Sequence, residues 1–251
     1  MLQVRDLTLA YTGEPVLAGV NLEVGRGEFA SLVGPSGSGK SSLLRAVMEL
    51  QRPSAGTIEL AVPLDQVGFL FQDDALLPWR TACDNVALGL RIRGMAKAQA
   101  QHEAQQWLTG LGLTGMGSRY PRELSGGQRK RVALAQVLAL KPKLLLMDEA
   151  FASLDAIVRH YLTQELLGWV ERERLTVLMV THDLEEAIAL SDTVYLLSNG
   201  PRATVRERYP VSLPRPRDLV KARTDPLFGS LLERLWQALS EEVSPLKAVQ
   251  T

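Results

Sequence analysis

The sequence GPSGSGKS at residues 34–41 matches the glycine-rich pattern of a phosphate-binding loop. The short apolar run Phe29–Val33 precedes this loop, and Ser42–Leu50, which has helical spacing, follows it. A glycine turn between a strand and a helix presents clustered backbone N–H donors and the positive end of the helix dipole to an anion. The stretch therefore predicts a strand–loop–helix unit that binds the phosphates of a nucleotide.

The side chains of this loop suit a triphosphate as well as its backbone does. Lys40 adds a positive charge that can reach the β- and γ-phosphates, and the hydroxyl of Ser41 can ligate Mg²⁺. The residues expected to contact the nucleotide here are Gly34, Pro35, Ser36, Gly37, Ser38, Gly39, Lys40, Ser41 and Ser42.

A second glycine turn, LSGGQ at residues 124–128, lies far downstream of the first. Ser125, Gly126 and Gly127 open a predicted helix that runs to Leu140, so this turn is a second anion-binding helix N-terminus in the same chain. Most proteins with a phosphate loop lack it. Together the two turns indicate a particular class of nucleotide-binding protein.

Two carboxylates, Asp148 and Glu149, follow the predicted buried strand Lys143–Met147. Ligands of α/β sheets bind beyond the carboxyl ends of the strands, so this position suits chemistry. Because neighbouring strand residues point to opposite sides, only one of the two carboxylates is expected to face a metal directly. A solvated acidic strand end is the alternative, and the phosphate loop in the same chain argues against it.

Composition limits the classes of protein that fit. The 251 residues suffice for one core with a sub-domain, and the hydrophobic content of 46% is that of a globular protein. The single cysteine, Cys83, cannot form an intramolecular disulfide, which suits the reducing cytosol. Apolar runs stay short of the roughly 18 to 20 residues that cross a bilayer. The 28 basic and 28 acidic residues balance, which argues against a nucleic-acid partner.

Strand and helix signals alternate along the chain, which predicts a mainly parallel sheet with helical crossovers. The first two strand signals flank a glycine-proline turn and indicate a hairpin. The stretch from residue 85 to about 120 lacks β-branched runs and predicts a helical insert. Predicted strands cover residues 3–11, 16–24, 29–33, 143–147, 176–180 and 194–197, and further helices cover 157–173 and 227–239.

The phosphate loop, the LSGGQ turn, the acidic strand end and His182, in this order, make the chain resemble the ATP-binding subunit of an ABC transporter over nearly its whole length. The resemblance implies an α/β P-loop NTPase (RecA-like) core with a mainly parallel sheet, a small antiparallel β subdomain and an inserted helical subdomain. It implies an ATP-binding domain at residues 1–215, with the helical subdomain at about 83–125, and a C-terminal helical extension at 216–251.

The resemblance also assigns roles to single residues. Asp148 becomes the Walker B residue that holds Mg²⁺ through a water, and Glu149 becomes the general base that orients the attacking water. Gln72 resembles the Q-loop glutamine, His182 the H-loop residue that contacts the γ-phosphate, and Tyr11 the aromatic that stacks on adenine. The implied catalytic set is Glu149, His182, Gln72 and Lys40, and the implied metal-binding set is Ser41, Gln72 and Asp148.

The residues themselves leave alternatives open at three places. A lone glutamine after the apolar run Val67–Phe71 is ordinarily a surface residue, and a strand aromatic such as Tyr11 more often packs in a core. The loop from Asp73 through Leu77, Pro78, Trp79 and Arg80 is unusually apolar, which suits either a subdomain core or a docking surface for a membrane partner.

In the family that the chain resembles, the LSGGQ turn completes the nucleotide site of a second subunit. The resemblance therefore implies that Ser125, Gly126, Gly127 and Gln128 contact ATP bound to a partner copy, with two ATP molecules at head-to-tail sites. Residues Ala152–Asp155 match the D-loop, which bridges the two subunits. ATP and Mg²⁺ are the implied cofactors. A membrane permease, and indirectly an extracytoplasmic solute-binding protein, are the implied partners at the cytoplasmic face of the inner membrane.

Three further segments are similar to the nitrate, sulfonate and taurine branch of bacterial importers: LLPWRT at 76–81, DNV at 84–86 and LPRPRD at 213–218. The chain departs from the family pattern at Ala150, Ala152 and Gln136, and the stretch 56–67 is short, which predicts a trimmed β hairpin. The competing interpretations are a non-transport ABC ATPase of DNA repair or translation and a P-loop small-molecule kinase. The LSGGQ turn argues against the kinase.

Overall fold

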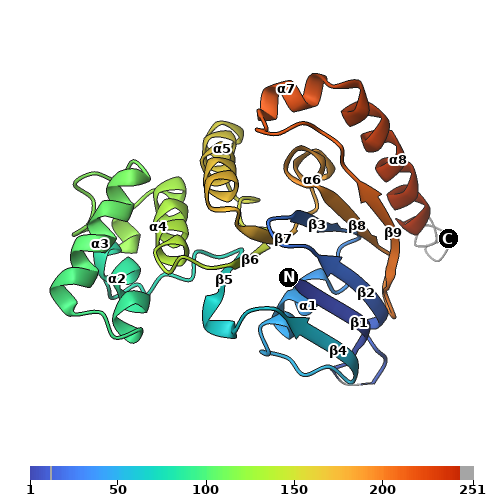
Figure 1. Ribbon diagram of the computed structural model, residues 1–251, viewed down its shortest axis with the longest axis horizontal. Helices are drawn as coiled ribbons and strands as arrows, with labels where there is room; N and C mark the ends of the chain where they lie inside the picture. The colour runs from blue at the N-terminus through green and yellow to red at the C-terminus, as the bar shows by residue number, and fades with distance from the viewer. Residues whose placement is uncertain (12, 244–251) are drawn as a thin grey trace. The chain divides into compact units, whose positions relative to one another are not determined.

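The computed structural model describes residues 1–11 and 13–243 (Figure 1). The chain divides into two compact units, the first made of Met1–Leu64 with Gln164–Thr251 and the second of Asp65–Thr163. Residues 244–251, the end of the predicted C-terminal extension, lie outside the described residues. Within the described part, no helix is both long and apolar enough to span a membrane.

The first unit begins with a small antiparallel sheet of strand order β2-β1-β4 (Figure 1). Its strands are β1 (Leu2–Leu9), β2 (Leu17–Val24) and β4 (Ala55–Leu60). In β2 buried and exposed side chains largely alternate, as expected of a strand with one covered face. The pairing of β1 with β2 confirms the predicted hairpin. After β4 the chain forms the short 3-10 helix η1 (Leu64–Gln66).

A second sheet region of the first unit carries the strand that leads into the phosphate loop. Strand β3 (Phe29–Val33) pairs in parallel with β7 (Thr176–Val180) and β8 (Thr193–Leu197), and β9 (Val205–Pro210) pairs with β8 antiparallel. All residues of β3, β7 and β8 are buried, which explains their continuous apolar sequences. The sequence signals for these three strands were correct to within a residue, and β9 had no such signal.

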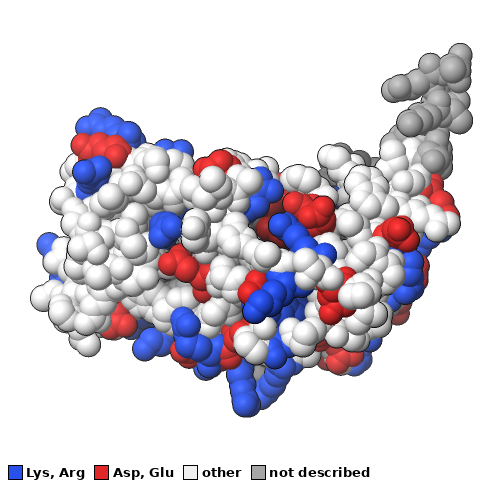
Figure 2. All heavy atoms as spheres, turned by 90° about the horizontal axis from the view of Figure 1, so that it is seen from above, with Lys and Arg blue, Asp and Glu red and all other residues white. Residues whose placement is uncertain are grey.

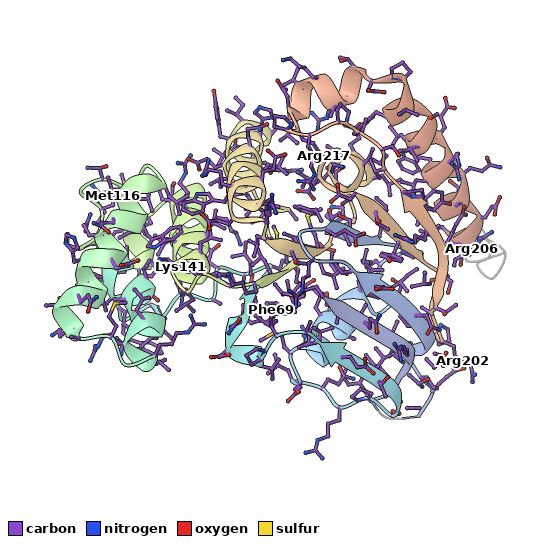
Figure 3. The ribbon with its side chains drawn as sticks, viewed as in Figure 1. Phe69, Met116, Lys141, Arg202, Arg206 and Arg217 are labelled. Carbon is purple, nitrogen blue, oxygen red and sulfur yellow. The ribbon has the colours of Figure 1, made fainter. Side chains whose placement is uncertain are left out.

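Among the described residues, four helices belong wholly to the first unit: α1 (Lys40–Val47), α6 (Leu184–Leu190), α7 (Leu219–Thr224) and α8 (Pro226–Val243). Helix α8 buries Phe228, Leu231 and Leu235, whose spacing of three and four residues gives one apolar face. Both α7 and α8 contact α6 (Figure 1). On β9, Arg206 forms ion pairs with Glu241 and Glu242 of α8 (Figure 3).

The proline-spaced segment LPRPRD fastens the C-terminal helices to the sheet through Asp192. The Asp192 carboxylate accepts hydrogen bonds from the backbone N–H of Phe29 at 2.9 Å, from Arg215 Nη2 at 2.7 Å and from Arg217 Nη2 at 2.9 Å. Arg217 is buried, and this burial lowers its pKa to about 10 despite the opposing effect of Asp192. In this structure the segment has an anchoring role.

The second unit holds the parallel pair β5 (Val67–Leu70) and β6 (Leu144–Asp148) and a group of helices. Gly68 of β5 lies so close to α4 (Gly126–Leu138), the helix that begins at the LSGGQ turn, that an added Cβ would lie 2.6 Å from Val137 Cγ1. Helix α2 contacts both α3 and α4 (Figure 1). The helices are α2 (Ala82–Ile92), α3 (Lys97–Gly110), the 3-10 helix η2 (Pro121–Glu123), α4 (Gly126–Leu138) and α5 (Ala156–Glu173), the last of which continues into the first unit.

Basic and acidic side chains are interspersed on the face that Figure 2 shows. That face carries no broad surface of a single sign, in line with the balanced composition of the chain. A surface of one sign is the electrostatic footprint of a nucleic-acid-binding protein.

Candidate nucleotide-binding site

The phosphate loop joins β3 to α1, as the sequence predicted, and its backbone requires glycine at two positions. Gly39 caps α1 with a left-handed backbone, φ 91°, and Gly37 has φ 80°. A Cβ at position 39 would lie 2.8 Å from both Val16 Cγ1 and Leu17 Cδ2. At position 37 an added Cβ meets nothing within 4 Å. Helix α1 begins at Lys40, two residues before the predicted start.

The buried polar groups of the loop fit a phosphate ligand. Lys40 is 7% exposed, and its Nζ donates to the carbonyl oxygens of Gly34 at 2.9 Å and Pro35 at 2.7 Å. The Ser38 hydroxyl is buried and has no hydrogen-bond partner within the described part of the chain. A buried hydroxyl without a partner is costly, and a ligand oxygen would satisfy it.

Tyr11 lies beside this loop. Its hydroxyl is 2.9 Å from the hydroxyl of Ser42 in α1, although the two residues are 31 positions apart. The Tyr11 side chain is 57% exposed, so the alternative of a packed core aromatic does not hold. Adenine stacking by the Tyr11 ring stays a prediction.

His182 lies in the turn between β7 and α6 and is exposed. The turn is held by its neighbours on both sides. The Thr181 hydroxyl donates to Glu186 at 2.6 Å and accepts from the backbone N–H of Asp183 at 3.1 Å, and Asp183 caps α6. His182 therefore projects from a fixed backbone at the carboxyl end of a buried parallel strand, where α/β folds place ligands.

In the second unit, Asp148 is the last residue of β6 and is 7% exposed. Glu149 follows the strand and has a left-handed backbone, φ 44°. The expected strand alternation between the two carboxylates is therefore wrong, because the strand ends before Glu149. The backbone N–H of Ala152 donates to the Glu149 carbonyl at 3.1 Å and closes a turn there. Non-glycine residues in this conformation concentrate at functional sites.

The LSGGQ turn forms a helix N-terminus with a full capping box. Ser125 accepts a hydrogen bond from the Gln128 backbone N–H at 3.3 Å, and the Gln128 side chain accepts one from the Ser125 N–H at 2.9 Å. Ser125 and Gly126 are exposed. Gly127 is required by packing, because an added Cβ would lie 2.8 Å from Val158 of α5.

Gln72 is exposed in the loop that leaves β5, in the same unit as the LSGGQ turn. Two residues near it were missed by sequence reasoning: Asp74 in the loop and Lys130 in α4, which form an ion pair of 3.0 Å. A basic residue on a helix ordinarily signals a solvated face, so no local pattern marks Lys130 as buried.

The apolar loop before α2 is fixed by Asn85, which is fully buried. The Asn85 side chain accepts from the Leu77 backbone N–H at 2.8 Å and donates to the carbonyl oxygens of Leu77, Arg80 and Thr81. Trp79 at the tip is 71% exposed. Of the two alternatives for this loop, the structure excludes a core position for Trp79.

The predicted site residues are thus shared between the two units. The phosphate loop, Tyr11 and His182 belong to the first unit, and Gln72, Ser125–Gln128 and Asp148–Glu149 belong to the second. Side-chain contacts join Tyr11 to Ser42 of α1 in the first unit, and Asp74 to Arg129 of α4 in the second.

Comparisons with known proteins agree with this geometry. The ABC transporter family model matches residues 17–152. An aliphatic sulfonates import ATP-binding protein of Nocardia farcinica is 44% identical over 86% of this chain and 87% of its own length. A taurine import ATP-binding protein of Escherichia coli K12 is 39% identical over 96% of this chain and 98% of its own length.

A solved ATP-binding cassette, dimeric in a post-hydrolysis state with ADP and Pi, is 30% identical and matches 85% of this chain and 100% of its own, with a TM-score of 0.76. The fold and the phosphate loop define a P-loop ATPase. The chain belongs to the ABC transporter family, as its two glycine turns predicted.

Proposed function

We propose that this chain is the ATP-hydrolysing subunit of an importer and that it energises uptake of a small solute through a separate permease. The proposal rests on two helix N-termini in one chain that each follow a glycine turn and suit a phosphate, those of α1 and α4. Relatives named for sulfonate and taurine import support this direction of transport and a small solute of that class. They also disfavour the alternative of DNA repair or translation.

ATP binds first at the phosphate loop. The backbone N–H groups of the loop and the Lys40 ammonium hold the β- and γ-phosphates, and the Ser38 hydroxyl gains the partner that it lacks. Ser41 in the first unit and Gln72 and Asp148 in the second each carry an oxygen of the kind that Mg²⁺ prefers, and Asp148 would hold the ion through a water. Mg²⁺ would supply charge neutralisation of the phosphates. The exposed Tyr11 ring is available to stack on the adenine.

Glu149 acts on the water that attacks the γ-phosphate. A carboxylate is a suitable general base. Because Glu149 has a left-handed backbone directly after β6, its side chain does not continue the alternation of the strand. His182, on the fixed turn before α6, contacts the γ-phosphate and stabilises the charge that develops there.

Two copies of the chain complete each other's sites. The exposed Ser125 and Gly126 at the start of α4 contact the γ-phosphate of ATP bound to a second copy. The capping box keeps this helix N-terminus formed when no nucleotide is present. The solved dimer of a similar cassette supports a pair of this kind. ATP closes the pair, and hydrolysis opens it.

The permease docks on the rigid loop that presents Trp79. A large exposed aromatic on a backbone fixed by Asn85 is typical of an interface anchor. The chain thus works as a peripheral subunit at the cytoplasmic face of the inner membrane, and a solute-binding protein on the far side delivers the cargo.

The variant Glu149→Gln tests this function. It keeps the shape of the side chain but loses the base, so we expect ATP hydrolysis to fall by about 100-fold or more while ATP binding persists. Size-exclusion chromatography with Mg²⁺ and ATP should then detect a stable dimer. Glu233→Gln, which changes an exposed carboxylate of α8, is the matched control and should behave as wild type. Hydrolysis near the wild-type rate by Glu149→Gln would remove Glu149 from its role.

A further inference from the structure

The ammonium group of Lys130 is almost completely buried, with 1% of the side chain exposed. Its Nζ donates to the carbonyl oxygens of Gln72 at 2.9 Å and Phe71 at 3.3 Å, and lies 3.0 Å from Asp74 Oδ1. An ammonium has three N–H donors, and these contacts provide three acceptors. The buried charge is therefore paired, as a buried charge must be.

Asp74 forms ion pairs with two side chains of helix α4. Its Oδ1 pairs with Lys130, and its Oδ2 accepts a hydrogen bond from Arg129 Nε at 3.1 Å. Arg129 Nη1 also donates to the carbonyl of Leu124, the residue before the capping Ser125, at 2.9 Å. Two successive side chains of α4 thus bind the loop from Phe71 to Asp74.

These contacts connect the LSGGQ turn with Gln72, which have separate roles in the proposed function. Gln72 serves the nucleotide bound by its own chain, whereas Ser125 serves the nucleotide bound by the partner copy. Lys130 lies 5 positions after Ser125 on the same helix, and its Nζ holds the Gln72 backbone directly. A displacement of the N-terminus of α4 is therefore transmitted along the helix to Lys130 and, through its hydrogen bond, to the backbone of Gln72.

We propose that Lys130 and Asp74 form a lock that makes the LSGGQ turn and Gln72 one rigid piece. Through this lock, binding of the partner's γ-phosphate by Ser125 positions Gln72 at the chain's own nucleotide, which couples the two sites of the dimer. The proposal rests on the two-copy function above. Lys130 and Asp74 are positioning residues, and neither touches ATP.

The test compares Asp74→Ala, Lys130→Met and the double variant with wild type. Each should lower kcat and reduce the Hill coefficient for ATP from above 1 to about 1, since coupling of two sites is typically worth at least about fivefold. ATP affinity of the single copy should stay within about twofold, because the phosphate loop is untouched. The double variant should lose no more than the worse single variant, because the residues act as one unit.

Arg93→Met is the matched control. Arg93 also holds backbone carbonyls in the second unit, those of Leu140 and Asp65, but beyond the other end of α4. It should lower thermal stability without changing the Hill coefficient. If the lock variants fail to fold, Asp74→Asn keeps the side-chain shape and removes only the charge, and its Hill coefficient must still fall.

Two results would overturn the lock. One is an unchanged Hill coefficient and kcat in folded lock variants, and the other is strictly additive losses in the double variant. Failure of the proposed function is a different result, because wild type would then show neither ATP-driven dimers nor hydrolysis.

Discussion

Replacing Gly39 by alanine tests how the chain builds its phosphate loop, and Gly37→Ala is its matched partner. Both glycines have a left-handed backbone, with φ of 91° and 80°. They differ in their surroundings. A Cβ at position 39 would lie 2.8 Å from Val16 and Leu17, whereas a Cβ at position 37 would meet nothing within 4 Å.

The two costs follow from these distances. A left-handed backbone costs an alanine about 1 to 2 kcal/mol, and both variants bear this cost. Overpacking against a buried side chain adds about 1 to 3 kcal/mol, and Leu17, which is fully buried, imposes it only at position 39. Gly39→Ala should therefore destabilise the nucleotide-free protein by about 2 to 5 kcal/mol, and Gly37→Ala by about 1 to 2 kcal/mol.

Urea unfolding without nucleotide measures both values by linear extrapolation. Addition of ATP gives a second measure, because ligand at 100 times its Kd stabilises a protein by about 2.7 kcal/mol. Gly39→Ala should lose most of this gain, since relief of the clash moves the N-terminus of α1. Equal losses of stability in the two variants would show that packing against Val16 and Leu17 does not require glycine at position 39.

Three other predictions follow from exposed or buried side chains. Trp79→Ala should spare ATP hydrolysis but abolish co-purification with a permease, whereas Trp236→Ala, which changes an exposed residue of α8, should leave both intact. A Trp79→Ala variant with a lowered melting temperature that still binds the permease would contradict this prediction. Asp192→Ala should lower the free energy of unfolding, measured in urea, by about 3 kcal/mol, because it leaves the buried Arg217 guanidinium without its carboxylate partner. Arg217→Met should cost less, and a larger loss in Arg217→Met than in Asp192→Ala would contradict this prediction. Tyr11→Ala should weaken ATP binding about tenfold or more in a fluorescence titration, and Tyr11→Phe hardly at all, since the ring does the stacking; equal effects would contradict this.

Patterns local in sequence predicted much of the fold. Buried parallel strands read as continuous apolar runs, so Phe29–Val33 and Thr176–Val180 were predicted with their observed bounds. Strand β9, with the sequence VRERYP, was missed because most of its side chains are exposed and its strand conformation depends on pairing with β8. Helix α1 ends at Val47, earlier than predicted, and Glu49 then takes a left-handed backbone that the sequence does not signal.

The site was predictable where it rests on short motifs and unpredictable where it rests on distant contacts. Both glycine turns are recognisable from a few adjacent residues, although the side chains that crowd Gly39 and Gly127, those of Leu17 and Val158, lie far away in sequence. Lys130 is not recognisable in this way, because the carbonyl of Gln72 that it binds is 58 positions away. The left-handed backbone of Glu149 was also missed, since it depends on where β6 ends and not on the identity of the two carboxylates.

In the proposed function, ATP hydrolysis needs the LSGGQ turn of a second copy. ATP hydrolysis and ATP binding by Ser125→Arg test this requirement most directly, with Ser212→Arg, which changes an exposed loop serine, as control. Arginine removes the helix cap at a cost of about 1 kcal/mol, so the variant should stay folded. We predict ATP binding like that of wild type but no hydrolysis, whereas Lys40→Ala should lose binding itself. Near-normal hydrolysis by Ser125→Arg would contradict the account, because one copy would then hydrolyse ATP unaided.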